Sequence, residues 1–324
     1  MRTCRWIVAL SFLALVVPAF AQDKPVTLKW KFEKDKPFFQ EMKTVTKQTL
    51  KVQGSDISQN QNMTFYFSWT PKSQDGDNWV IEQKIIGVKM EIDIGGTKVA
   101  YDSTKDNPGT NPLGDFFNKL KDSEFKITVN KENKVIKVEG RDAFVTKLIG
   151  ANPQMEALLK QILTEDALKE MAEPTFAVVP SKEVKKGDAP WERPSKIDMG
   201  PLGRYENMYK YTYDGAGADK LDTIKVDTTT KYVPPPDTAM NQGAGALPFK
   251  IKSGDLKSTS SSGTVKFDNV KGRVESVEMA LTIKGELNIE ISGQTTKVEL
   301  TQDQNTSVKT SDKNPIEKTP EKTK

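Results

Sequence analysis

Acidic side chains are the main candidates for chemistry in this sequence, because other catalytic side chains are scarce. The 324 residues contain no histidine and a single cysteine, Cys4. This composition excludes imidazole acid–base catalysis, a Ser-His-Asp triad and ordinary Cys/His sites for zinc or haem. Carboxylates remain, and a pair of carboxylates can hydrolyse a glycoside without histidine.

Two short acidic segments have oxygen ligands spaced as a calcium ion requires. Asp75–Asn78 is the first, and Asp102, Asp106 and Asn107 form the second. Neither segment has the further acid that would complete a coordination shell. Asp75-Gly76 is also a strong hairpin-turn signal, so we interpret both segments as turns and assign no metal.

Most other acids alternate with lysines at strand positions expected to face solvent, as Glu275, Glu278 and Glu290 do. This arrangement favours a solvated surface over a catalytic pair. We therefore expect a protein that is not an enzyme and has no catalytic residue and no cofactor, and a carboxylate-based hydrolase is the third interpretation.

Aromatic side chains at alternate strand positions are the candidates for ligand contact. Met63 to Trp69 alternates apolar and polar residues, which is the pattern of a strand with one buried face. Such a stripe forms core if it is covered, and it lines an apolar cavity if a curved sheet closes only partly. The candidate ligand-lining residues are Trp30, Phe65, Phe67, Trp69, Leu158 and Ile162.

The strand patterns predict a mainly β protein built from long antiparallel hairpins. The alternation changes phase at Ile85–Gly87, which predicts a β-bulge. Connections between strands are too short for crossover helices. We expect one or two curved, half-barrel-like sheets.

A central helical segment, residues 141–173, separates two β-rich halves, and a short helix is expected over Leu113–Leu120. Apolar residues recur there at three- and four-residue spacing, and Pro174 should end the last helix. An apolar helix face requires cover, so these helices should pack on the concave face of the sheet.

The N-terminus resembles a secretory signal peptide, with a basic start, an apolar core and small residues before a cleavage point after Ala21. The apolar run is shorter than the roughly 20 residues that span a bilayer, so we expect cleavage, secretion or a periplasmic location, and no membrane span. The predicted segments are 1–21 signal peptide, 22–140 N-terminal β half, 141–173 helical segment, 174–303 C-terminal β half and 304–324 disordered tail.

Val184, Gly187, Asp188 and Trp191 form a Val-x-x-Gly-Asp-x-x-Trp element. This element resembles the Val-x-x-Gly-Asp-x-Trp element of a secreted bacterial family known as a domain of unknown function, with the tryptophan one residue later here. Residues 265–272 are similar to a strand–turn–strand unit of that family and, more distantly, of the half-barrel lipoprotein carriers of the bacterial envelope. The resemblance implies a curved β fold and an extracytoplasmic compartment.

The charge balance and the fold lead to two expected roles. The 48 basic and 44 acidic residues are evenly distributed, so nucleic acid is not an expected partner. The preferred interpretation is a non-catalytic envelope protein that binds an apolar ligand or lipid between sheet and helices. The alternative is a structural or assembly component that binds another envelope protein through exposed sheet edges.

Overall fold

The structure is a computed structural model that describes residues 24–105, 112–236 and 249–317. The predicted signal peptide, residues 1–21, lies outside these ranges. Within them, no helix combines the length and the apolar character needed to cross a membrane.

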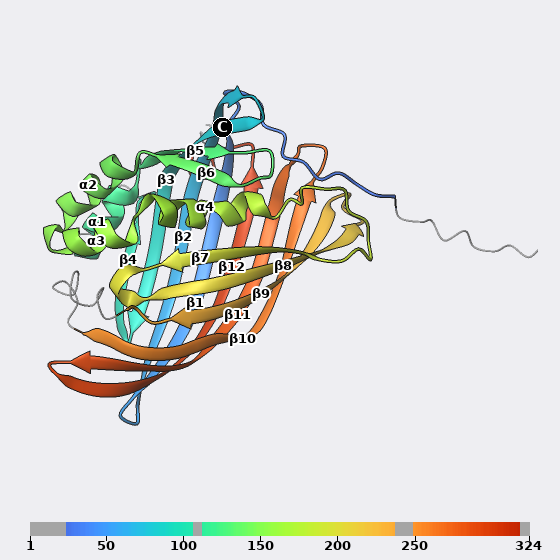
Figure 1. The fold of residues 1–324 in the computed structure, drawn as a ribbon. Coiled ribbons are helices and arrows are strands. Elements are labelled where there is room, and N and C mark those ends of the chain that lie inside the picture. Colours follow the sequence, from blue (N-terminus) through green and yellow to red (C-terminus); the bar gives the residue numbers. More distant parts are fainter. Residues whose placement is uncertain (1–23, 106–111, 237–248, 318–324) are drawn as a thin grey trace, which may run out of the picture.

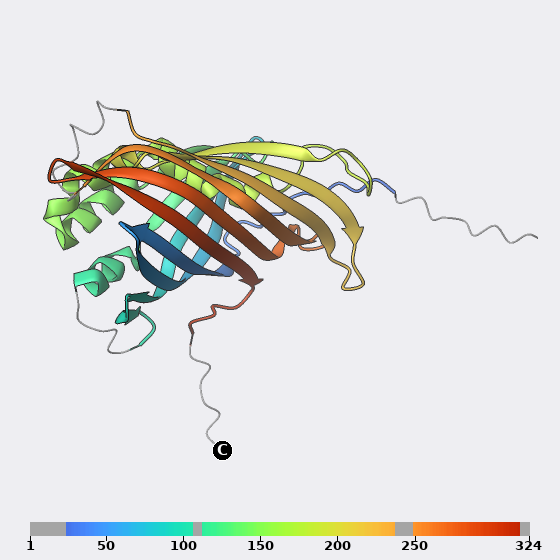
Figure 2. The same ribbon diagram turned by 90° about the horizontal axis from the view of Figure 1, so that it is seen from below.

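The described strands form one antiparallel, twelve-stranded sheet. Its order is β6-β5-β3-β2-β1-β12-β11-β10-β9-β8-β7, and β4 pairs with β3 outside this order. The sheet is strongly curved and open (Figures 1 and 2), which confirms the predicted mainly β, half-barrel-like class. The strands are β1 (Phe38–Val52), β2 (Ser55–Asp75), β3 (Asn78–Ile94), β4 (Thr97–Asp102), β5 (Glu124–Val129), β6 (Val135–Glu139), β7 (Trp191–Asp198), β8 (Arg204–Ala216), β9 (Asp222–Val233), β10 (Lys250–Asp268), β11 (Arg273–Ile291) and β12 (Gln294–Ser311).

The first long strand and the last strand lie side by side in the middle of the sheet. β1 pairs with β12 along nearly its whole length, from Phe39 opposite Ser311 to Val52 opposite Val298. The two β-rich halves therefore share one sheet. This pairing corrects the predicted disordered tail from residue 304, because residues 304–311 belong to β12. Backbone hydrogen bonds to β1 and β11 hold these residues, so they need no apolar stripe of their own.

Two local predictions about the N-terminal hairpins are confirmed. The register of β2 and β3 shifts between Tyr66–Gly87 and Phe67–Ile85, which is the predicted bulge. Asp75 and Asn78 close the β2–β3 hairpin, as the turn interpretation of Asp75–Asn78 requires.

The helices lie where the apolar spacing predicted them. They are α1 (Pro112–Leu120), α2 (Arg141–Ala151), α3 (Glu156–Ile162) and α4 (Glu165–Ala177), with short 3₁₀ helices η1 (Pro153–Met155) and η2 (Gly200–Leu202). The prediction that Pro174 ends the last helix is wrong, because α4 continues to Ala177. A proline this near the C-terminus removes one helical hydrogen bond without stopping the turn.

Helix α4 lies between the two end strands of the curved sheet, β6 and β7 (Figure 1). Glu173 Oε2 accepts a hydrogen bond from the Val135 N–H of β6 at 2.9 Å, and Glu170 Oε2 accepts one from the Lys196 N–H of β7 at 3.0 Å. Free amides on an edge strand are templates for unwanted pairing. Two glutamates three residues apart therefore each satisfy one amide on a different sheet edge.

Candidate functional site on the concave face

Trp30 and Trp69 belong to a packed aromatic core at the α4 end of the sheet. They are 6% and 2% exposed, and Phe176 of α4 is 0% exposed. Phe176 contacts both indoles, with ring centroids 5.6 Å from Trp30 and 5.7 Å from Trp69. The Trp30 Nε1–H also donates to the Phe176 carbonyl oxygen at 3.3 Å. We call this region the packed end, and its two predicted ligand-lining tryptophans are core residues.

Leu158 and Ile162 help to position α3. Leu158 is 3% exposed and Ile162 is half-buried. Gly200 of η2 lies directly against Ile162, because a Cβ at this glycine would be 3.6 Å from Ile162 Cγ2. Ile162 therefore helps to hold α3 against the η2 turn, and Leu158 belongs to the buried face of the same helix.

Phe65 and Phe67 are half-buried and lie beside the packed end on the concave face of β2. Their rings stack with centroids 5.8 Å apart, and the Phe67 ring lies 6.2 Å from Trp69. The structure therefore connects four of the six candidates into one aromatic series, which runs from the buried core to a more exposed surface.

A row of apolar residues crosses eight strands of the concave face next to Phe67. Its members toward both ends are buried, with Val88 and Ile224 both 0% exposed, whereas its four members on β2, β1, β12 and β11 are half-buried. The neighbouring row, which contains Met63 of β2 and Met279 of β11, is also buried toward its ends and half-buried in its middle. In strand order the first row is Val88, Phe65, Met42, Val308, Val277, Val265, Ile224 and Tyr213.

The half-buried part of these rows forms a continuous apolar surface, which we call the apolar strip. Cross-strand register brings its side chains together, since side chains two residues apart share a face. Its methionines are flexible and adapt to irregular partners. The strip consists of Phe65, Phe67, Met42, Met63, Val277, Met279 and Val308.

Beyond the strip, the same face carries a belt of uncharged polar side chains. Gln48 of β1 lies opposite Gln59 of β2 and Gln302 of β12, and Thr46 lies opposite Gln61 and Gln304. All six are half-buried. Gln302 and Gln304 continue the two-residue alternation of the apolar residues on β12. The prediction of a disordered tail missed this sequence signal. We call these residues the glutamine belt.

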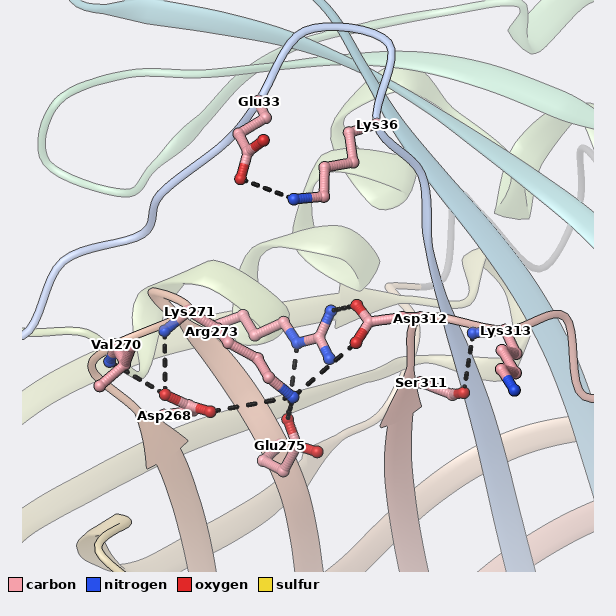
Figure 3. A network of polar contacts seen from close by, with 10 residues as sticks. All are labelled: Glu33, Lys36, Asp268, Val270, Lys271, Arg273, Glu275, Ser311, Asp312 and Lys313. Atoms are coloured by element: carbon pink, nitrogen blue, oxygen red, sulfur yellow. Dashed lines mark hydrogen bonds and ion pairs between the residues drawn. The ribbon is translucent and has the colours of Figure 1, made fainter.

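A pocket of about 250 Å³ borders the packed end, next to the loop that contains Glu33 and Lys36 (Figure 3). Lys31 fixes this loop to the β10–β11 turn, because its N–H donates to the Gly272 carbonyl at 2.8 Å. The pocket combines aromatic walls with charged side chains. Its lining is Trp30, Lys31, Phe32, Glu33, Lys36, Pro37, Phe38, Pro71, Lys271, Arg273 and Asp312.

The charges around this pocket pair with one another. Arg273 is 8% exposed, and its Nη1 donates to Asp312 Oδ1 at 2.5 Å. Lys271 Nζ lies 3.7 Å from Glu275 Oε2 and 3.8 Å from Asp312 Oδ2 (Figure 3). The hydrogen bond from Arg273 lowers the pKa of Asp312. This cluster connects the β10–β11 turn to the end of β12.

The other acidic candidates have local structural partners. Asp102 Oδ1 accepts hydrogen bonds from the Thr104 N–H at 3.0 Å and the Thr104 hydroxyl at 2.6 Å. Asp106 and Asn107 lie outside the described residues, and Glu290 pairs with Lys252 at 3.7 Å. Within the described ranges, no group of three or more His, Cys, Asp or Glu side chains is placed to hold a metal ion.

The fold and the concave face define a curved, open β-sheet protein whose inner surface is only partly packed. The chain belongs to the Family of unknown function (DUF6263), whose model matches residues 77–274, from β3 to the start of β11. This membership confirms the resemblance to a domain of unknown function. It brings no catalytic assignment.

No curated protein matches the sequence. Among solved structures, the chain is similar to one described as lipid-protein interactions in lipovitellin, with 9% identity and a TM-score of 0.45, covering 87% of this chain and 25% of that one. Pseudomonas aeruginosa OccK7 gives 6% identity and a TM-score of 0.21, covering 85% and 99% of the two chains. An outer membrane channel from Pseudomonas putida F1 has 6% sequence identity and a TM-score of 0.24, and the match covers 89% of this chain and 99% of that chain. This chain thus spans about a quarter of the lipovitellin chain, and TM-scores this low support no functional argument.

Proposed function

We propose that this protein is a non-catalytic, secreted or periplasmic component of the bacterial envelope that holds a lipid on the concave face of its sheet. The extracytoplasmic location rests on the signal-peptide pattern of residues 1–21. The binding role rests on the apolar strip.

The observation that carries the proposal is the change in exposure along a single cross-strand row. Val88 and Ile224 are fully buried by neighbouring elements, while Met42 and Phe65 between them remain half-buried. Burying apolar surface stabilises a complex by about 25 cal/mol per Å². A lipid chain on the strip would supply the cover that the packed end receives from α4.

Sheet-edge binding of another envelope protein, the alternative role, has less support. α4 lies along both end strands, and Glu170 and Glu173 each accept an edge amide. A strand added at either edge would have to displace this helix.

The binding experiment compares two substitutions on one strand. Met42→Ser removes an apolar side chain from the strip, and Val45→Ser makes a similar change on the opposite face of β1. Titration of the purified protein with a fluorescent long-chain fatty acid should give affinity that is roughly five- to tenfold weaker for Met42→Ser only, equivalent to about 1 kcal/mol.

Native mass spectrometry of protein purified from its own envelope supplies an independent test. A co-purified lipid is the expected result. Absence of both a bound lipid and fatty-acid binding by the unsubstituted protein would refute the proposal, and so would equal losses in the two variants.

A further inference from the structure

Three successive inward-facing residues of β7 carry polar atoms with no hydrogen-bond partner in the described part of the chain. These atoms are Trp191 Nε1, Arg193 Nε and Ser195 Oγ, and all three are buried. Ser195 as a whole is 5% exposed. Residues two apart in a strand share a face, and Trp191 stacks on the buried Tyr211 ring at 5.5 Å, so this face is the concave one.

Arg193 is the unusual member of this group, because it brings a charge to the inner face. Its side chain has no hydrogen bond and no carboxylate within 4 Å among the described residues. Glu173 of α4 is near enough for its charge to interact with that of Arg193, but both Glu173 and Glu170 already accept a backbone N–H from a sheet edge. A guanidinium does not deprotonate, so partial burial without a close counter-ion is unfavourable.

The surrounding residues add further hydrogen-bonding groups. Arg193 lies opposite Tyr209 of β8, which lies opposite Thr228 of β9. The buried Thr228 Oγ1 also has no partner within the described ranges. An indole N–H, a guanidinium and two hydroxyls together suit a group that offers several acceptor oxygens.

We propose that Trp191, Arg193 and Ser195 bind the anionic head group, a carboxylate or phosphate, of the lipid whose chain lies on the apolar strip. This inference rests on the proposed function. The row that begins at Trp191 continues through Tyr211, Val226 and Gly263 to Met279 of the strip. Four strand spacings separate its ends, roughly 19 Å along the sheet, so the ligand has a long chain.

The test measures head-group preference, using palmitic acid, hexadecanol, a long-chain phosphatidic acid and inorganic phosphate as competitors of a fluorescent fatty acid. The unsubstituted protein should bind the acid at least tenfold more tightly than the alcohol. Arg193→Gln should abolish this preference and leave the affinity for the alcohol unchanged. The control is Arg204→Gln, which removes an arginine that is paired with Glu206 at 2.9 Å, and it should keep the preference.

The competitors separate the two sources of the anion. Displacement by palmitic acid alone identifies a carboxylate ligand, and displacement by phosphatidic acid identifies a phospholipid. Displacement by inorganic phosphate as effective as that by phosphatidic acid would overturn the link between head group and chain.

Failure of the head-group proposal is distinguishable from failure of the proposed function. Equal binding of acid and alcohol by the unsubstituted protein would overturn the head-group site and leave lipid binding intact, whereas binding of neither would overturn both. Equal losses for the two ligands in Arg193→Gln would show a purely structural role. If Arg193→Gln does not fold, Ser195→Ala should weaken acid binding a few-fold without changing alcohol binding, and no change would count against the site.

Discussion

The packed end and the apolar strip are two regions of the same sheet face with the same alternating pattern, yet they differ in cover. Trp69 packs edge-on against Phe176 from α4, which also contacts Trp30 from the N-terminal segment. Phe65, four residues earlier on the same face of β2, is half-buried. The comparison teaches that alternation identifies the inner face, whereas elements far away in sequence decide whether that face becomes core or a binding surface.

The largest expected effect comes from comparing large-to-small substitutions in the two regions. Phe176→Ala should lower the free energy of unfolding by about 3–5 kcal/mol, because it leaves a cavity among fully buried rings. Met63→Ala, on the strip, should cost about 1 kcal/mol, since part of that side chain is already exposed. Urea denaturation measures both values, and similar losses would remove the distinction between the regions.

An intermediate effect should come from the contact between α4 and the sheet edge. Glu173→Ala removes the acceptor for the Val135 N–H and should cost about 1–2 kcal/mol at neutral pH. Glu173→Gln keeps an acceptor oxygen and should be at least as stable as the unsubstituted protein at neutral pH. Hydrogen exchange at Val135 should accelerate in the alanine variant, and unchanged exchange would contradict this account.

The pH dependence of the glutamine variant adds a sharper test. Burial raises the pKa of Glu173 above its ordinary 4.5, so its protonated form favours the folded state. The stability that comes from holding this carboxyl protonated is present below pH 4.5 and is lost as the pH rises through the raised pKa. Unfolding measurements across this range should show Glu173→Gln gaining stability relative to the unsubstituted protein as the pH rises.

The smallest effect is expected outside the packed end, at Asp312. Its pKa is lowered by Arg273, so its contribution is present above the ordinary value of 3.8 and is lost as the pH falls through the lowered pKa. Because its side chain is 62% exposed, Asp312→Asn should cost less than about 1 kcal/mol at pH 7, with the difference fading in acid. Asp56→Asn, at an exposed position on β2, is the control and should change the free energy of unfolding at pH 7 by less than about 0.5 kcal/mol.

The hairpins were predictable because their signals are local. The Asp75-Gly76 turn, the change of phase at Ile85–Gly87 and the helix before Leu120 each depend on a few neighbouring residues. The pairing of β1 with β12 was not predictable in this way, since it joins residues that lie between 246 positions (Val52 and Val298) and 272 positions (Phe39 and Ser311) apart.

The site was only partly predictable for a related reason. Phe65 and Phe67 were identified from alternation, but whether they are covered depends on the position of α4. Arg193 alternates with exposed residues on a short strand that contains a proline, so its sequence context resembles a solvent-facing position. Its surroundings come from β8 and from α4, which local patterns do not bring together with β7.

The pairing of β1 with β12 also has a consequence for biosynthesis. Until Ser311 has been made, the growing chain holds two half-sheets, each with a long bare edge at the future centre of the molecule. Such edges readily join the edges of other copies, and contacts this distant in sequence form slowly. A prematurely terminated product that ends near residue 300 should therefore aggregate, although nearly every hairpin it needs is already encoded.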